Sequence, residues 1–411
     1  MKILVVCQYY YPEPFKVTDV CEALAKDGHD VTVLTGRPNY PAGVVPKEYR
    51  SKAHADEVLN GVHIIRCYER GRGKGAVNLA INYASFYFAA MKTVKKLPKD
   101  FDIVFSYQLS PIFMALPARW YKNKYKVPMF LYCSDLWPES LKIYLKSENT
   151  PIFKWVKSIS KKVYDSADKI ATQSDTFIDY LKEVHDIPDE KLTYIPNFAD
   201  ESYLSQDFTP EDTATDLVFM GNVGVAQDLE DVTLAFVKAV DRIERENIKD
   251  ENGKDVDIHL HIVGSGVRLD AIKELVDKLS INDKVTFYGQ RPQEEMPKYY
   301  KIADACIVSL KADNRIGLTL PAKVQGYMAA GKPILGMIDG SCMNVIRDAD
   351  CGTCSAARDV SGFSDSIIDF AINVSKQSYY GTNSREYFMS HFRKEIHIKS
   401  VEKELSELVN E

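Results

Sequence analysis

Several features that define common enzyme classes are missing from this 411-residue sequence. It has no GxxxxGK[ST] stretch, which excludes a P-loop NTPase, and no GxGxxG after the first apolar run, which disfavours a nicotinamide-dependent enzyme. The longest apolar run, residues 79–91, is shorter than the roughly 20 residues that span a bilayer. The apolar run at the N-terminus is too short for a secretion signal and no cleavage site follows it, so we expect a cytoplasmic protein.

The eight cysteines do not form a disulfide or zinc framework. Cys7, Cys67, Cys133 and Cys306 lie in strand-like segments, which is typical of reduced thiols in a core. Cys351 and Cys354 have CxxC spacing, but there is no second CxxC pair and no adjacent histidine. We therefore interpret CGTC as a turn after a helix and expect no metal site.

The net charge of −6 is divided unevenly. Residues 1–195 contain 28 Lys and Arg against 22 Asp and Glu, whereas residues 196–411 contain 24 against 36. The acidic total argues against nucleic acid as a partner. The basic first part favours a domain that faces an anionic surface or ligand.

The chain alternates apolar runs with amphipathic stretches, which predicts an α/β protein with parallel sheets. Residues 18–30 are expected to form a helix that ends at Gly28, between two strands. A polar, proline-containing stretch at residues 195–216 interrupts the pattern and reads as a linker. Strands are expected at residues 2–7, 31–36, 61–69, 102–107, 128–135, 169–174 and 192–196, and after the linker at 217–222, 258–266, 284–290, 305–310 and 332–338.

This pattern predicts two Rossmann-like domains and a C-terminal helix. We expect an N-terminal acceptor-binding domain at residues 1–196, a second domain at 197–375, and a helix in 376–411 that packs back toward the first domain. Two such sheets facing each other leave a cleft at the carboxyl ends of their strands, where open parallel sheets bind ligands.

Four features of the second half lie directly after predicted strands and predict a pocket for a nucleotide diphosphate. Glycines there let backbone N–H groups approach an anion, and a proline suits the first turn of a helix. Arg268 and Lys323 supply the positive charges. Any one of these glycines alone would indicate only a turn. The four groups are Gly221, Asn222, Gly224 and Gln227; Gly264, Gly266 and Arg268; Gln290 and Arg291; and Leu320, Pro321 and Lys323.

The ordered segments along the chain resemble family 4 glycosyltransferases of the GT-B fold, and more narrowly the fucosaminyltransferase-like enzymes of bacterial O-antigen and capsule synthesis. The resemblance implies a nucleotide-sugar donor bound by the second domain, an acceptor bound by the first, retention of anomeric configuration and no metal. The Asp-x-Asp at residues 348–350, the pattern typical of metal-dependent transferases, lies in a polar turn, which is a poor location for such a site. The segments are MKILVVCQYYYPEP, GHDVTVLTGRPNYPAG, DLWPES, IPNFAD, GNVGVAQ, VGSG, YYKIADACIVSLK and PAKVQGYMAAGKPIL.

The sequence departs from the family at the donor site. The family carries two glutamates eight positions apart, and Leu318 and Gly326 occupy those positions here. Ser341 stands where a further glutamate is common. Lys323 and Pro321 still match the narrower subfamily. We interpret the losses as altered donor recognition.

Asp135 is the candidate catalytic residue of the first domain, together with Arg268 and Lys323 of the second. It follows a predicted strand, where it would orient the acceptor hydroxyl or the donor sugar. The alternative is an aspartate that caps a helix.

Residues 69–97 and 154–162 combine basic side chains with apolar stretches. Such a helix can lie on an anionic membrane surface, although the apolar part also fits a core helix. We expect peripheral contact with the inner face of the cell membrane and a polyprenyl-diphosphate-linked saccharide as acceptor.

The sequence and the resemblance together favour a retaining enzyme that transfers a sugar from a UDP-sugar to a lipid-linked saccharide in surface-polysaccharide synthesis. The sugar is expected to be an N-acetylated hexosamine or a deoxyhexosamine. No cofactor beyond the donor is expected. The alternatives are a catalytically inactive GT-B partner protein, an inverting transferase with Asp135 as its base, and a nucleotide-sugar epimerase.

Overall fold

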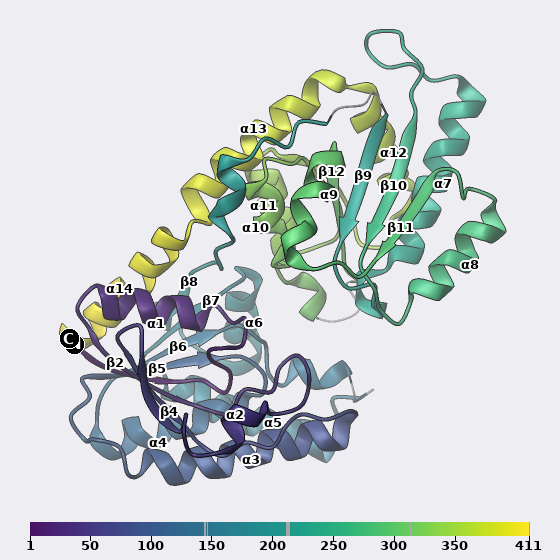
Figure 1. Cartoon of the computed structure of the whole chain (residues 1–411). Helices are drawn as coiled ribbons and strands as arrows, with labels where there is room; N and C mark the ends of the chain where they lie inside the picture. Colours follow the sequence, from purple (N-terminus) through teal and green to yellow (C-terminus); the bar gives the residue numbers. More distant parts are fainter. Residues whose placement is uncertain (144, 146, 211–213, 312–314, 411) are drawn as a thin grey trace. The chain divides into compact units, whose positions relative to one another are not determined.

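Two separate parallel sheets organise the chain in the computed structural model, which describes residues 1–143, 145, 147–210, 214–311 and 315–410 (Figure 1). The first unit comprises Met1–Ile195 together with the residues from His397 onward, and the second comprises Pro196–Ile396. The prediction of two parallel-sheet α/β domains is confirmed.

The first unit has an eight-stranded sheet in the order β3-β4-β2-β1-β5-β6-β7-β8. All its strand pairs are parallel except β3 with β4. The central strands are continuous apolar runs because helices cover both faces of the sheet. The strands are β1 (Lys2–Val6), β2 (Asp30–Thr35), β3 (Asp56–Leu59), β4 (Val62–Arg66), β5 (Ile103–Gln108), β6 (Met129–Cys133), β7 (Lys169–Thr172) and β8 (Leu192–Tyr194).

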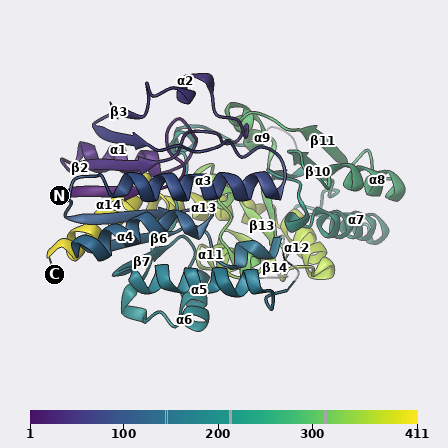
Figure 2. The ribbon, with the colours of Figure 1, turned by 90° about the horizontal axis from the view of Figure 1, so that it is seen from below.

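Helices α3, α4 and α5 lie side by side over one face of this sheet (Figures 1 and 2). On the other face, α14 is tied to the turn after α1 by a 2.9 Å contact between His29 Nε2 and Glu402 Oε1. The helices associated with the unit are α1 (Val17–Lys26), α2 (Lys47–Arg50), α3 (Ala76–Val94), α4 (Leu116–Tyr125), α5 (Pro151–Ser166), α6 (Thr176–His185) and α14 (Lys394–Asn410).

The second unit has a six-stranded, all-parallel sheet in the order β11-β10-β9-β12-β13-β14. Its strands are β9 (Thr215–Met220), β10 (Ile258–Val263), β11 (Val285–Gly289), β12 (Ala305–Ser309), β13 (Ile334–Met337) and β14 (Gly352–Ser355). Its helices are α7 (Leu229–Glu246), α8 (Leu269–Leu279), α9 (Met296–Ile302), α10 (Lys323–Ala329), α11 (Ser341–Asp348), α12 (Val360–Ile372) and α13 (Val374–His391). Two apolar clusters fill the space between these helices and the sheet.

The C-terminal segment differs from the expected single helix that packs on the first domain. Residues 376–396 belong to the second unit, in α13 and the start of α14, and only the residues from His397 onward belong to the first. The reason is that α13 packs against α10 and buries Tyr380 and Phe388 in the second unit. In the part of the chain that the structure describes, no helix is both long and apolar enough to cross a membrane.

Candidate functional site

Adjacent glycine turns at the carboxyl edge of the second sheet hold each other in place. The Gly221 N–H donates to the Val263 carbonyl at 2.9 Å, and the Gly264 N–H donates to the Gly289 carbonyl at 2.9 Å. A Cβ atom added at Gly264, whose φ is +152°, would lie 1.8 Å from the Gly221 carbonyl oxygen. Only glycine therefore fits at position 264, and the backbones after β9 and β10 meet directly.

The next turn along this edge is fastened in the same way. The Val223 N–H donates to the Ser265 carbonyl at 2.9 Å, and the Arg268 N–H donates to the Val223 carbonyl at 3.1 Å. A Cβ atom added at Gly266 would lie 2.2 Å from the Val223 oxygen. Gly221, Gly264 and Gly266 therefore form one contiguous backbone surface.

Lys323 reaches this surface from α10. Its Nζ atom is shielded from solvent and has no hydrogen-bond partner among the described residues. It lies 3.7 Å from the centre of the Phe219 ring, and a Cβ atom added at Gly221 would be 3.0 Å from it. Burial lowers the pKa of Lys323 to about 7. An amine without a counter-charge beside a glycine turn is a binding group for an anion.

Arg268 is placed differently from the free cation that we predicted. Its Nε donates to the Glu230 carboxylate in the first turn of α7, and its side chain is 44 % exposed. Glu230 was not among the predicted site residues, although an acidic residue in the first turn of a helix after the Gly221 turn is a visible signal. Arg268 is thus close to the glycine surface, but its charge is already paired.

The polar side chains after β9 bind one another. The Gln227 Oε1 atom accepts from the Gly224 N–H at 3.2 Å and from Asn222 Nδ2 at 3.4 Å. Gln227 thereby fixes the turn at Gly224 and leaves the Asn222 residue exposed.

Gln290 and Arg291 follow β11 and are both exposed. Gln290 Oε1 accepts from Ser265 Oγ at 3.4 Å, so Gln290 joins the turn after β10. Arg291 Nε donates to the Tyr288 carbonyl at 3.0 Å, which stabilises the end of its own strand.

Pro321 does not occupy the first turn of α10, and the prediction was wrong on this point. The helix begins at Lys323 with Ala322 as its N-cap. The Pro321 carbonyl instead accepts the Val324 N–H at 3.0 Å in a turn that leads into the helix. Leu320 is buried in the core, with 4 % of its surface exposed.

The two positions without the family's glutamates have different surroundings. Gly326 is buried, and a Cβ atom added there would lie 3.1 Å from the Tyr300 hydroxyl, so position 326 faces the core. Leu318 lies against Gly340, where an added Cβ atom would come within 2.7 Å of Leu318 Cα. The neighbouring Ser341 Oγ is buried at the start of α11 and has no partner within the described ranges. Ser341 is therefore a further polar group at this edge of the sheet.

Asp135 lies in the first unit, after β6. Its Oδ2 atom accepts from Ser110 Oγ at 2.6 Å, and Trp137 Nε1 donates to the same Ser110 oxygen at 3.1 Å. Burial raises the pKa of Asp135, and the Ser110 hydrogen bond opposes this effect. Asp135 thus ends a hydrogen-bonded chain that joins the carboxyl ends of β5 and β6.

The Asp-x-Asp sequence has a structural role. Asp350 is in a left-handed turn with φ +45°, and its Oδ2 atom accepts from the Tyr379 hydroxyl at 2.7 Å. Cys351 and Cys354 are free thiols. A search of the described residues finds no cluster of three His, Cys, Asp or Glu side chains arranged to hold a metal ion.

A hollow of about 740 Å³ lies at the opposite, amino-terminal edge of the second sheet. Lys332 and Arg385 line it, but both have backbone carbonyl partners: Lys332 Nζ donates to Phe208 and Ala303 at 2.5 and 2.6 Å, and Arg385 Nη1 to Leu204 at 3.4 Å. These cations fasten the linker to the sheet.

Comparison with known proteins gives the family of each half. Residues 17–203 match the model of Glycosyltransferase Family 4, and residues 206–387 match that of Glycosyl transferases group 1. N-acetyl-alpha-D-glucosaminyl L-malate synthase from Bacillus anthracis is 26% identical over 225 residues, which are 52% of this chain and 54% of that protein. The match thus spans about half the length of this curated relative.

Solved structures share the fold over the whole chain. A sucrose-phosphate synthase from Thermosynechococcus elongatus superimposes with a TM-score of 0.71 at 16% identity, covering 99% of this chain and 98% of that one. HepE from Anabaena in complex with UDP superimposes with a TM-score of 0.67 at 12% identity, covering 99% and 100%. The Glycosyltransferase Family 4 match of the first half, the group 1 match of the second half and the two parallel-sheet units together identify the chain as a glycosyltransferase with the GT-B fold.

Proposed function

We propose that this protein transfers a sugar from a UDP-sugar, with retention, to a polyprenyl-diphosphate-linked saccharide in the synthesis of a surface polysaccharide. The observation that carries the proposal is the solvent-shielded Lys323 Nζ atom beneath Gly221. No side chain at Gly221 would separate a donor diphosphate bound there from the Lys323 amine, since a Cβ atom at Gly221 would lie 3.0 Å from Nζ. Loss of the UDP leaving group would then be assisted by Lys323 and the turn amides.

The relatives support the choice of donor. HepE from Anabaena was solved in complex with UDP, which fits a UDP-sugar donor here. The Bacillus anthracis relative is named as a synthase of N-acetyl-alpha-D-glucosaminyl L-malate. The N-acetylglucosaminyl part of that compound fits our proposal of an N-acetylated hexosamine or deoxyhexosamine as the transferred sugar. The other part of that compound is L-malate, so a small carboxylate is the second candidate for the acceptor.

The outward face of α3 and α5 supports a membrane-bound acceptor. On α3, Val77, Ile81 and Phe88 are 74 %, 39 % and 69 % exposed and lie along one side of the helix at spacings of four and seven residues. On α5, which belongs to the same helix layer beyond α4, Ile152 and Trp155 are 57 % and 59 % exposed. Exposed apolar side chains on the helices of one layer are typical of a surface that enters a lipid interface.

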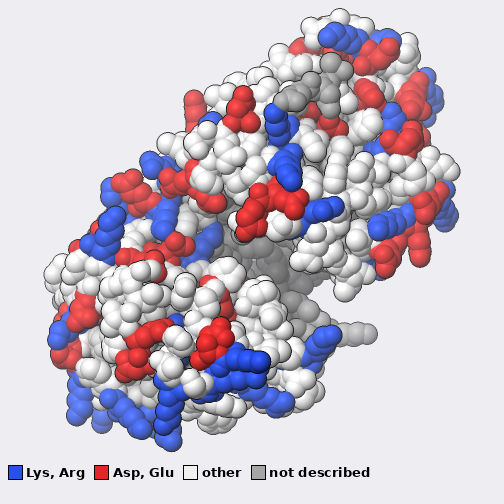
Figure 3. Space-filling view, viewed as in Figure 1, with Lys and Arg blue, Asp and Glu red and all other residues white. Residues whose placement is uncertain are grey.

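Basic residues surround this apolar face. Residues 70–126 contain 11 Lys and Arg and only two acidic residues. In Figure 3, Lys and Arg gather along the lower edge of the first unit, below α3 and α4. Each basic side chain near an anionic bilayer contributes about 1 kcal/mol to binding. The proposed site of action is therefore the inner face of the cell membrane.

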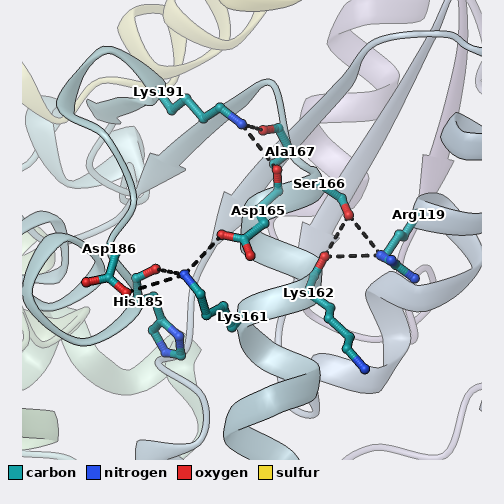
Figure 4. Close-up of polar contacts among 9 residues, drawn as sticks. All are labelled: Arg119, Lys161, Lys162, Asp165, Ser166, Ala167, His185, Asp186 and Lys191. Atoms are coloured by element: carbon teal, nitrogen blue, oxygen red, sulfur yellow. Dashed lines mark hydrogen bonds and ion pairs between the residues drawn. The ribbon is translucent and has the colours of Figure 1, made fainter.

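Figure 4 shows two lysines of α5, one held by contacts within the protein and one whose side chain is available for contact with lipid. Lys161 Nζ donates to the His185 carbonyl at 2.5 Å and also lies 3.4 and 3.5 Å from the Asp165 and Asp186 carboxylates. The Lys162 side chain points away from the other residues drawn, and the contacts marked at Lys162 are made by its carbonyl oxygen, which accepts from Arg119 Nε at 3.1 Å and from Ser166 Oγ at 2.6 Å. Lys162 is thus a candidate lipid contact, whereas Lys161 joins α5 to α6.

The proposal is tested by nucleotide binding followed by product analysis. UDP is expected to stabilise the protein against heat more than GDP does, and Lys323→Ala is expected to weaken UDP binding. The anomeric configuration of the transferred sugar is then determined by NMR. Inversion would move the assignment to an inverting transferase, and UDP binding without hydrolysis or transfer, across a panel of UDP-sugars, would favour an inactive partner protein.

A further inference from the structure

The guanidinium of Arg72, in the loop after β4, lies over two tyrosine rings. Its Cζ atom is 5.8 Å from the centre of the Tyr9 ring and 5.5 Å from that of Tyr40. Within the described ranges, no carboxylate forms an ion pair with Arg72 and no acceptor receives a hydrogen bond from its side chain. The cation is therefore held in place without a counter-charge.

The backbone around Arg72 is fixed by contact between two loops. The Gly73 N–H donates to the Gly43 carbonyl at 2.9 Å, and the Arg72 N–H donates to Asn39 Oδ1 at 3.1 Å. A Cβ atom added at Gly71 would lie 2.6 Å from the Gly43 oxygen. The loops after β2 and β4 thus meet at glycines, and Arg72 is positioned at the carboxyl edge of the first sheet.

Two buried acidic residues, Glu13 and Glu69, accept hydrogen bonds from other groups, although the Arg72 charge also acts to lower the pKa of Glu13. Glu13 accepts the N–H groups of Asn39, Tyr40 and Tyr10 at 2.7, 2.6 and 3.3 Å, and burial raises its pKa. Glu69 Oε1 accepts side-chain amides of Gln8, Asn39 and Asn82 at 2.8, 3.1 and 2.7 Å.

Burial raises the pKa of Glu69 to about 8, so this carboxyl is mainly protonated at neutral pH. Glu69 consequently contributes little negative charge to offset Arg72.

Tyr9 supplies a second unused group. Its hydroxyl is shielded from solvent and has no hydrogen-bond partner in the part of the chain that the structure describes. Burial raises the pKa of Tyr9, so it remains a neutral O–H donor. Tyr40 is 41 % exposed, and Arg72 itself is half-buried. A guanidinium without a carboxylate partner is a group that binds phosphate or carboxylate, and Tyr9, whose ring it overlies, offers an unused hydroxyl donor.

We propose that Arg72, with Tyr9, binds an anionic group of the acceptor and so makes negative charge a requirement for acceptor recognition. The inference rests on the proposed transfer function, because it assigns this edge of the first unit to the acceptor. A diphosphate is the group we favour, since the proposed acceptor carries one. A carboxylate has the same charge chemistry and is distinguished by experiment.

The test uses the full chain saturated with UDP, so that the donor site is blocked. Three probes are titrated separately by calorimetry: farnesyl diphosphate for a lipid-borne diphosphate, inorganic diphosphate for the free ion, and L-malate for a dicarboxylate. At least one is expected to bind. Arg72→Met is expected to weaken that binding at least about tenfold, and Arg72→Lys by less, because a point charge replaces a planar fork.

Arg70→Met is the matched control. Arg70 is exposed in the same loop, and within the described ranges its side chain forms a hydrogen bond with Asn78 Oδ1 alone, at 3.5 Å, so loss of that side chain is expected to leave probe binding within about twofold. UDP affinity of every variant is measured in parallel. If UDP does not bind the wild-type chain, the proposed function fails. If UDP binds but no probe does, or if Arg72→Met binds the probes as tightly as the wild type, the acceptor inference alone is overturned.

Discussion

The Lys323 Nζ atom lies 3.7 Å from the centre of the Phe219 ring, so an amine at the start of α10 is held against the apolar end of β9. No carboxylate or carbonyl among the described residues bonds to it. The amine therefore gains more from an incoming anion than a solvated lysine would, because its charged form is poorly stabilised before binding.

Replacing Lys323 is expected to weaken UDP binding by at least about tenfold, which is the effect of losing a buried charge-assisted hydrogen bond. UDP binding requires the charged amine, whereas the free amine has a pKa of about 7. UDP affinity of the wild type should therefore fall as the pH rises above 7. Calorimetry from pH 6 to 9 on the wild type and Lys323→Met measures both effects, since the variant lacks this titration.

The same substitution should stabilise the unliganded protein. The folded-state pKa of Lys323 is lowered from 10.5, so its unfolded form binds more protons and the wild type loses stability as the pH falls from 10.5 toward 7. Lys323→Met removes an unpaired buried amine and should raise the free energy of unfolding at pH 7 by about 1–3 kcal/mol. Chemical denaturation at pH 7 without ligand checks this, and a loss of stability would contradict a destabilising role for the lysine.

Gly264→Ala is expected to disrupt the donor edge. The added Cβ atom would lie 1.8 Å from the Gly221 oxygen, so the turns after β9 and β10 must separate, at a cost of about 3 kcal/mol or more. Gly253→Ala is the control, because Gly253 also has positive φ, at +79°, but no atom within 4 Å of the added Cβ. Its cost should be about 1–2 kcal/mol, from the backbone conformation alone. Thermal unfolding of both variants gives the comparison.

Most of the fold was predictable because the buried parallel strands are continuous apolar runs. The strands that the sequence did not reveal are β3, with two acidic residues among four, and β14, which reads GTCS. Both lie at sheet edges, where pairing with one neighbour determines the strand and side-chain pattern does not. The C-terminal helix was assigned to one domain because a helical pattern does not reveal which surface it packs against.

The candidate site was predictable only in part. Glycines after strands indicate turns that meet at one edge, as Gly221 and Gly264 do. Side-chain partners are not visible in this way. The pairing of Arg268 with Glu230 joins α8 to α7 across 38 residues, and the core-facing position of Gly326 depends on Tyr300 of another helix. Such contacts depend on tertiary packing, which the local pattern does not encode.

His185 should make the first unit sensitive to acid. It is 0 % exposed between the Tyr164 and Tyr180 rings, and burial lowers its pKa from 6.5 to about 4. The unfolded chain therefore binds a proton that the folded chain does not, and stability is lost as the pH falls from 6.5 to 4. His185→Phe should remove up to about 3 kcal/mol of this loss. Urea denaturation at pH 7 and pH 4.5 measures it, and an equal loss in both proteins would exclude His185 as the cause.

Membrane contact should depend on Phe88 and Trp155. Charged replacements, Phe88→Glu with Trp155→Glu, remove exposed apolar surface and add negative charge, so co-sedimentation with phosphatidylglycerol vesicles should fall strongly. Wild-type binding should also weaken between 50 and 500 mM salt, because the basic residues around the face act through screened charges. Val58→Glu is the control, since Val58 is 71 % exposed on β3 at the sheet edge. If Val58→Glu reduces vesicle binding as much as the paired replacements do, the loss of binding comes from the change in net charge and not from the loss of the apolar surface.

Asp135→Asn should separate binding from chemistry. Asparagine keeps an oxygen that accepts from Ser110 Oγ, so the chain from Trp137 through Ser110 and the melting temperature should change little. UDP affinity should be unchanged, because Asp135 belongs to the first unit and the Lys323 turn to the second. If the carboxylate orients the acceptor hydroxyl, the turnover number should fall about a hundredfold.

The pH profile then tests which form of Asp135 acts. Burial raises the pKa of Asp135. If activity depends on the charged carboxylate, the activity of the wild type should begin to fall at a higher pH, as the solution is made more acidic, than it would with an exposed aspartate. Residual activity of Asp135→Asn should lack this acidic limb. The product of both proteins should have the same retained configuration. A wild-type turnover number in Asp135→Asn would assign the residue a structural role only, and an inverted wild-type product would make Asp135 the general base.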